Sequence, residues 1–298
     1  MRIGIDLGGT KTELIAVDDE GLECLRFRRP TPTGNYEATV ALLADMALQA
    51  EDELGQPATV GIGTPGAESV QSGLMKNCNS TCLNGRPLKH DIESVLEREV
   101  RLSNDANCFA LSEAVDGAGE AADVVFGVIL GTGVGGGLVV HGQVIEGANR
   151  IAGEWGHNPL PVPDKVESPG PDCYCGRKGC VETWLSGPGL AADHLRQFGA
   201  NLSAEQIALR AEAGDADCRQ SLDFYCDRLA RSLSGVINIV DPDVIVLGGG
   251  LSNVDRLYTQ VPKLWGEYVF SDEVNIRLLP PRYGDSSGVR GAAWLWGR

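Results

Sequence analysis

The spacing of apolar residues among polar ones changes repeatedly along this chain of 298 residues. Short apolar runs that stop at Gly, Pro or Asn-Asp are typical of buried strands, and apolar residues three or four positions apart are typical of amphipathic helices. The predicted strands are Arg2–Val17 (a pair around the turn 7–12), Thr59–Gly63, Val100–Asn104, Val124–Leu130, Leu138–Val140, Asp243–Leu247 and Val274–Leu279. The predicted helices are Tyr36–Leu54, Leu88–Glu99, Ala106–Val115, Pro188–Phe198, Ala204–Glu212, Ala216–Ile239 and Gly288–Trp296.

Strand and helix patterns alternate in both halves of the chain, which predicts an α/β protein. A strand, a glycine-rich turn and a second strand occur at the N-terminus and again over Val124–Val140, which suggests a duplicated domain. The length allows two domains with sizeable cores. The Gly- and Ala-rich segment 117–121 marks the predicted boundary.

Composition and charge narrow the class of protein. The net charge of −16 argues against a nucleic-acid-binding surface, which needs clustered Lys and Arg. Asp6 interrupts the first apolar run, so we expect no signal peptide, and the longest uncharged apolar stretch, Val124–Val140, is too short and glycine-rich to span a membrane. We therefore predict a cytoplasmic protein, whose nine cysteines are thiols or metal ligands rather than disulfides.

The first turn, after the strand that ends at Asp6, has the residues of a phosphate-binding hairpin. Gly8 and Gly9 allow a tight turn that exposes backbone N–H groups, and Thr10 and Lys11 can donate to phosphate oxygens. Asp6 can hold Mg²⁺ directly or through water. The segment is not a Walker A loop, because a strand follows where a helix is required. An ordinary hairpin turn is an equally good interpretation.

Two further glycine clusters follow apolar strands. Gly131–Gly137 formally contains the dinucleotide fingerprint G-x-G-x-x-G, but the strand Leu138–Val140 follows where that fingerprint requires a helix. A hairpin that faces phosphate is favoured there over a turn without a ligand. Gly248–Gly250 lets an adenine or a ribose approach the backbone, and a plain strand-to-loop turn explains that cluster equally well.

Asn104 and Asp105 stand at the end of a predicted strand, directly before a helix. Asp is a favoured helix N-cap, and the spacing alone favours this structural interpretation. The functional alternative makes Asp105 a general base that accepts a hydroxyl proton during phosphoryl transfer.

A polar, proline-rich segment, residues 159–180, follows the second strand pair, and we call it the cysteine loop. It carries Cys173, Cys175 and Cys180, and His157 lies just before it. These residues have the ligand types and the number of a closed zinc site. The alternatives are one disulfide with a spare thiol, or unrelated surface cysteines, and the spacing favours zinc over both.

Taken together, these motifs resemble the ROK family of sugar kinases from one end of the chain to the other. The segments that carry the resemblance are Asp6–Lys11, Asn104–Asn107, Gly131–Gly137, Gly153–His157, Cys173–Glu182 and Asp241–Gly250. Three further segments are most similar to bacterial fructokinases of the manno(fructo)kinase type: Lys76–Gly85, His157–Pro161 and Asp285–Trp296. The N-acetylglucosamine kinases of the family share Asn104–Glu113 and Gly127–Leu138 almost as well.

The resemblance implies an actin-like, hexokinase-like fold of two domains, with duplicated βαβ-rich cores and a nucleotide cleft between them. The expected small domain comprises residues 1–117 plus 286–298, and the expected large domain, 118–285, holds the zinc site and the surface of a homodimer. The implied reaction is the ATP-dependent phosphorylation of D-fructose to D-fructose 6-phosphate, with Mg²⁺ and a structural Zn²⁺. N-acetyl-D-glucosamine, glucose and mannose are the alternative substrates.

The functional residues of the family map onto this sequence one by one. Asp105 corresponds to the general base. The implied sugar-binding residues are Gly66, Asn79, Asn104, Asp105, Glu154, His157 and Glu182. The implied ATP-binding residues are Asp6, Gly8, Gly9, Thr10, Lys11, Thr132, Gly133, Gly135, Gly249 and Gly250, with Asp6 also a ligand of Mg²⁺. The zinc ligands correspond to His157, Cys173, Cys175 and Cys180, so His157 is expected to contact the metal through one ring nitrogen and the sugar through the other.

Sugar-responsive repressors of the same family are the alternative that is not an enzyme. Those proteins carry a helix-turn-helix domain before the first strand, which begins here at Ile3, and the acidic charge also disfavours DNA. We therefore expect a sugar, ATP and a second copy of the chain as partners, and neither nucleic acid nor a membrane.

Overall fold

The computed structural model describes residues 1–297, and the contacts of the chain divide it into two compact units. Unit 1 comprises Met1–Ala121, Gly137–Ala152 and Asp285–Arg298, and unit 2 comprises Ala122–Gly136 and Gly153–Gly284. Residue 298, where the predicted small domain ends, lies outside the described residues. Strands and helices alternate in both units, which confirms the predicted α/β class.

The predicted domain boundaries stay a prediction, and the division by contacts differs from them in one segment. Residues 137–152 contact unit 1, although the sequence assigned them to the large domain. The absence of a side chain at Gly137 explains this contact, since a Cβ atom there would lie 2.6 Å from the carbonyl oxygen of Ala106 and 2.9 Å from the Cβ of Ala110. Only glycine lets this strand pass so close to the helix that carries both alanines.

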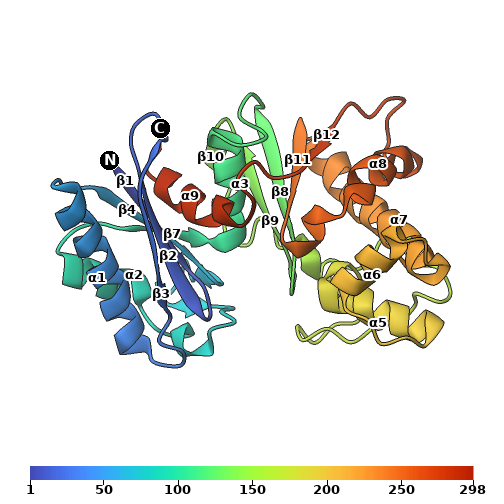
Figure 1. The fold of residues 1–298 in the computed structure, drawn as a ribbon, viewed down its shortest axis with the longest axis horizontal. Helices are drawn as coiled ribbons and strands as arrows, with labels where there is room; N and C mark the ends of the chain where they lie inside the picture. The colour runs from blue at the N-terminus through green and yellow to red at the C-terminus, as the bar shows by residue number, and fades with distance from the viewer. Residues whose placement is uncertain (298) are drawn as a thin grey trace. The chain divides into compact units, whose positions relative to one another are not determined.

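The sheet of unit 1 has five strands in the order β3-β2-β1-β4-β7 (Figure 1). Its strands are β1 (Arg2–Leu7), β2 (Lys11–Val17), β3 (Glu23–Pro30), β4 (Thr59–Thr64) and β7 (Arg101–Asn104). The first three pair antiparallel, and β1, β4 and β7 pair parallel. The carboxyl ends of β1, β4 and β7 therefore meet at one edge of the sheet.

Helices cover both faces of this sheet, and its strands β1, β2 and β4 are largely buried. The edge strand β3 instead alternates partly buried apolar residues with exposed polar ones. On one face lie α1 (Tyr36–Leu54) and α2 (Leu88–Leu96), and on the other lie α3 (Asp105–Val115) and α9 (Ser287–Trp294). The Asn35 side chain accepts from the Ala38 N–H and so begins α1, and Gly55 ends it with φ of +67°.

The C-terminal helix α9 packs directly on the backbone of the sheet. A Cβ atom at Gly4 would lie 2.2 Å from the carbonyl oxygen of Val289, and one at Gly61 would lie 1.9 Å from that of Ala292. Glycines in β1 and β4 are therefore what lets α9 complete the core of unit 1.

The second sheet has the order β10-β9-β8-β11-β12. Its strands are β8 (Val124–Leu130), β9 (Val134–Val140), β10 (Gln143–Val144), β11 (Val244–Gly248) and β12 (Arg277–Leu279), and β8, β11 and β12 pair parallel. The helices of unit 2 are α4 (Glu182–Leu185), α5 (Gly187–Phe198), α6 (Ala204–Glu212), α7 (Ala216–Val240) and α8 (Asp255–Leu264) (Figure 1). The short elements are the strands β5 (Ala67–Glu68) and β6 (Met75–Lys76) and the 3₁₀ helices Thr81–Leu83, Trp155–His157, Gly250–Asn253, Trp265–Glu267 and Gly284–Ser286.

Several predicted boundaries are wrong. The strand β9 begins at Val134, so the glycine turn is shorter than predicted. The helix α2 ends at Leu96 because Glu97 adopts a left-handed φ of +53°. The last strand begins at Arg277 rather than at Val274. No helix within residues 1–297 combines the length and the apolar character that crossing a membrane requires.

Candidate active site and metal centre

The predicted functional residues of unit 1 gather at the edge where the parallel strands end. Asp6 pairs with Gly63 across β1 and β4, and Asn104 pairs with Thr64 across β7 and β4. Asp105 follows Asn104 as the first residue of α3. We call Asp6, Asn104 and Asp105 the carboxylate edge.

Asn104 and Asp105 are held by hydrogen bonds with backbone groups. The Ala106 N–H donates to Asn104 Oδ1 at 2.9 Å and to Asp105 Oδ1 at 2.8 Å. Asn104 is the N-cap of α3, whereas the sequence favoured the aspartate, because the helix begins one residue earlier than predicted, at Asp105. Asn104 Nδ2 donates to the carbonyl oxygen of Gly66 at 3.2 Å, which ties two predicted sugar-binding residues together. The cap and a functional role are therefore compatible, since each amide atom of Asn104 retains further bonding capacity.

Both carboxyl groups of this edge are less acidic than usual. Limited hydration, together with the neighbouring charges of Asp105 and Glu13 and against that of Lys11, raises the pKa of Asp6 to about 6. Limited hydration also raises the pKa of Asp105, against the bonds from Ala106 and Asn104, although Asp105 keeps an exposed surface. Two neighbouring carboxylates with raised pKa values favour the binding of a divalent cation. The raised pKa of Asp105 also suits a proton acceptor.

The first glycine turn lies beside the loop that carries Asn79. A Cβ atom at Gly8 would lie 2.5 Å from the carbonyl oxygen of Lys11, so the turn requires glycine, and the Cβ position of Gly9 lies 3.9 Å from Ser80 Oγ. Thr10 and Lys11 are exposed. Unit 1 thus brings the predicted phosphate turn next to a predicted sugar loop.

Gly66 fixes the other end of that loop. Its φ is +74°, and a Cβ atom there would lie 2.3 Å from the carbonyl oxygen of Lys76 and 2.8 Å from the backbone nitrogen of Cys78. Any other residue would push the segment 76–78 away.

In unit 2, Glu182 lies against the second glycine turn. The Val134 N–H donates to Glu182 Oε2 at 2.8 Å, and a Cβ atom at Gly133 would lie 2.7 Å from the same oxygen. Thr132, between Gly131 and Gly133, is exposed. The turn that was predicted to bind phosphate therefore also positions a predicted sugar ligand.

The remaining predicted ATP-binding glycines of unit 2 surround this turn. The Gly135 carbonyl accepts from Trp155 Nε1 at 2.8 Å. Gly249 has φ of +78°, and its Cβ position lies 2.6 Å from the carbonyl oxygen of Leu130, the last residue of β8. Gly250 is exposed and has no such constraint.

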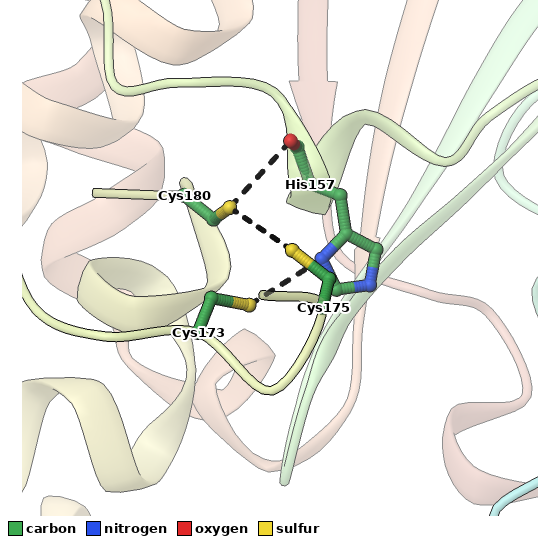
Figure 2. A group of neighbouring side chains, drawn as sticks. All are labelled: His157, Cys173, Cys175 and Cys180. Carbon is green, nitrogen blue, oxygen red and sulfur yellow. Dashed lines mark hydrogen bonds between the residues drawn. The ribbon is translucent and has the colours of Figure 1, made fainter. Parts of the chain in front are cut away.

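The structure brings His157, Cys173, Cys175 and Cys180 into one cluster (Figure 2), with ligand atoms all within 4.8 Å of one another. His157 Nδ1 lies 3.6 Å from Cys173 Sγ, and the Sγ atoms of Cys175 and Cys180 are also 3.6 Å apart. Tetrahedral zinc bonds to sulfur and nitrogen place neighbouring ligand atoms about 3.5–3.8 Å apart. The four residues fit a structural Zn²⁺.

The protein environment gives the three thiols different pKa values. Hydrogen bonds from Arg177 lower the pKa of Cys175 to about 6, whereas burial raises the pKa of Cys180 to about 12 and raises that of Cys173. A bound cation would favour the thiolate at all three, because the thiolate is the ligand.

The cysteine loop is also anchored at its proline-rich end. Glu167 accepts from Arg228 Nε at 2.7 Å and from Arg231 Nη2 at 2.8 Å, and both arginines belong to α7. These buried guanidinium groups outweigh the effect of burial and lower the pKa of Glu167 to about 2. The loop is thus held to its unit by two different means, a thiol cluster and an ion-pair network.

Sequence reasoning missed Tyr174, whose hydroxyl lies 3.0 Å from His157 Nε2. Glu154 is exposed and precedes the 3₁₀ helix that carries His157. The position of a tyrosine between two cysteines of the predicted zinc site was the available signal.

The chain is similar to known proteins along nearly its whole length. The model of the ROK family matches residues 2–298. The N-acetyl-D-glucosamine kinase of Yersinia pseudotuberculosis serotype O:1b (strain IP 31758) is 40% identical over 301 residues, which cover 99% of this chain and 98% of that protein. The crystal structure of a ROK hexokinase from Thermus thermophilus has a TM-score of 0.87 at 30% identity and covers 99% of this chain and 97% of its own. A ROK family glucokinase from Streptomyces griseus in complex with glucose and AMPPNP has a TM-score of 0.77 at 27% identity, covering 99% and 98%.

Proposed function

The chain belongs to the ROK family, and we propose that it transfers a phosphoryl group from ATP to N-acetyl-D-glucosamine. It is an ATP-dependent sugar kinase with the hexokinase-like, actin-like α/β fold that the sequence predicted. One observation carries the choice of sugar: a relative that is 40% identical over nearly the whole chain is an N-acetyl-D-glucosamine kinase. D-fructose, predicted from segments such as Lys76–Gly85, finds no support in that comparison.

In the proposed mechanism, unit 1 supplies the base. Asp105 accepts the proton of the sugar hydroxyl as the hydroxyl oxygen bonds to the γ-phosphorus and ADP leaves. The raised pKa of Asp105 supports this role, because a base works best when its pKa approaches the working pH. Asn104, fixed by its bond to Gly66, orients the sugar.

The glycine turns supply backbone N–H groups to the phosphates in this proposal. Gly8, Gly9 and Thr10 act from unit 1, and Thr132, Gly133 and Gly135 act from unit 2, with Gly249 and Gly250 towards the nucleoside. Asp6 and Lys11 stand beside the first turn, and Mg²⁺ held by Asp6 would neutralise phosphate charge.

The metal centre has a structural role in the proposal. A Zn²⁺ held by His157 and the three cysteines of the cluster would fix the loop that leads into Glu182. Nδ1 of His157 faces the thiols, so Nε2 is the nitrogen left to bind the sugar. Glu154 and Glu182 accept from further sugar hydroxyls.

The test is an assay of ADP release with N-acetyl-D-glucosamine, D-fructose, D-glucose and D-mannose in Mg²⁺-containing buffer. A kcat/KM highest for N-acetyl-D-glucosamine supports the proposal. A preference for D-fructose would return the substrate to the one predicted from the loop around Asn79. Turnover of none of the four would refute the proposed activity.

A further inference from the structure

Tyr174 stands in an unusual place, between two thiols of the metal cluster yet with 79% of its surface exposed. Its hydroxyl lies 3.0 Å from His157 Nε2, and its ring meets the imidazole edge to face, with centroids 5.1 Å apart and planes at 83°. A side chain so exposed is held here by the histidine rather than by burial.

The thiol cluster determines where the imidazole carries its proton. Nδ1 faces Cys173 Sγ at 3.6 Å, and in the proposed zinc site this nitrogen binds the metal ion. With Nδ1 on the metal, the proton of the neutral ring lies on Nε2, so Nε2–H donates and Tyr174 Oη accepts.

A single N–H group makes one hydrogen bond of full strength. The proposed function, on which this inference rests, assigns Nε2 of His157 to a sugar hydroxyl. We propose that Tyr174 is a positioning residue whose hydroxyl takes the place of a sugar hydroxyl on His157 in the sugar-free protein and is displaced when the sugar binds.

The backbone at Tyr174 can stay fixed during this exchange. The Cys173 N–H donates to the carbonyl oxygen of Arg177 at 2.8 Å, and the Gly176 N–H donates to that of Cys173 at 3.0 Å. Rotation of the Tyr174 side chain alone breaks its hydrogen bond with His157 Nε2. The exposed phenol then exchanges one hydrogen bond for another with water, so displacement has a small but finite cost.

This role predicts that removing the hydroxyl strengthens sugar binding. Tyr174→Phe keeps the ring against His157 and removes only the competing acceptor. We expect a dissociation constant for N-acetyl-D-glucosamine about fivefold lower than that of the unsubstituted protein, which is the effect of one ordinary hydrogen bond. KM should fall by a similar factor with little change in kcat, because the chemistry at Asp105 is untouched.

The experiment is titration calorimetry with N-acetyl-D-glucosamine in the absence of ATP, followed by steady-state kinetics. Tyr268→Phe is the matched control, since it removes a hydroxyl that bonds Asp227 elsewhere in unit 2 and should leave sugar affinity unchanged. Zinc content is measured on each protein, so that a change in affinity is not attributed to loss of the metal. In spectra of protein labelled with ¹⁵N-histidine, the His157 Nε2–H signal should move in sugar-free Tyr174→Phe and in the sugar-bound unsubstituted protein.

Two results would overturn the role of Tyr174 while the kinase activity stands. Equal affinity in Tyr174→Phe would mean that the hydroxyl does not compete, and weaker affinity would mean that it binds the sugar itself. If the unsubstituted protein neither binds nor phosphorylates the sugar, the proposed function fails as well, and the four-sugar assay separates that outcome from the other two.

Discussion

The carboxylate edge of unit 1 and the cysteine loop of unit 2 hold their proposed functional residues by different means. At the carboxylate edge the parallel register of β1, β4 and β7 sets the positions of Asp6 and Asn104, and Asp105 follows as the first residue of α3. The backbone of the cysteine loop has isolated bridges, such as Pro159 with Cys180, and turn hydrogen bonds but no regular strand pairing. The thiol cluster and the ion pairs of Glu167 therefore supply much of what holds the loop. A lost side chain should therefore affect catalysis alone in the first region and structure first in the second.

The strongest test of this contrast is Asp105→Asn. The substitution removes the base and keeps a residue suited to the start of a helix, so we expect kcat to fall about 10²–10⁴-fold with an unchanged melting temperature. Asp255→Asn is the matched control, because Asp255 is likewise the first residue of its helix, α8. Steady-state kinetics and thermal unfolding measure both. A kcat near that of the unsubstituted protein would remove Asp105 as the base, and a large loss of stability would erase the contrast.

Cys175→Ser, in contrast to Asp105→Asn, should first affect the structure and only through it the activity. Removal of one thiolate should release the zinc and lower the melting temperature by about 5–10 °C, and KM for the sugar should rise because His157 and Glu182 flank the loop. Elemental analysis and thermal unfolding measure the two losses. Cys24→Ser, which changes an exposed cysteine outside the cluster, should keep both the zinc content and the melting temperature. Full zinc content in Cys175→Ser would contradict the metal assignment.

The pH dependence of activity should report on the carboxylate edge. Below about pH 6, the raised pKa of Asp6, this carboxyl gains a proton and no longer holds Mg²⁺, so kcat/KM should decline roughly tenfold per pH unit. Because a bound cation favours the charged form, a higher Mg²⁺ concentration should move this decline to lower pH. A decline that begins only near pH 4 and ignores Mg²⁺ would mean that Asp6 is an ordinary exposed carboxyl.

The sequence predicts best those features that depend on interactions between residues close together in the chain. The helix over Tyr36–Leu54 was predicted to the residue, since its amphipathic spacing and its terminal glycine are local signals. The strand Glu23–Pro30 was missed although Leu25 and Phe27 alternate with arginines and pack on the core. The helix Asp255–Leu264 was also missed, and it contains Pro262, which argues against a helix in a local reading.

The site shows the same limit. Its chemical types were predictable because glycine turns, a carboxylate at a strand end and a Cys/His cluster are local patterns. The contacts between these groups were not predictable from the sequence, because a contact such as that of Glu182 with the Gly133 turn joins residues far apart in the chain. Tyr174 was overlooked for the same reason, since its importance lies in a bond to His157 across the loop. The predicted homodimer stays a prediction.

The packing of α9 against Gly4 and Gly61 has a consequence for biosynthesis. Unit 2 ends at Gly284, whereas the core of unit 1 lacks its last helix until residues 287–294 have been made. Domains generally fold in the order in which they leave the ribosome. Here the unit that contains the N-terminus is the last to complete its core, and a chain truncated just before α9 would hold all residues of unit 2 but an open unit 1.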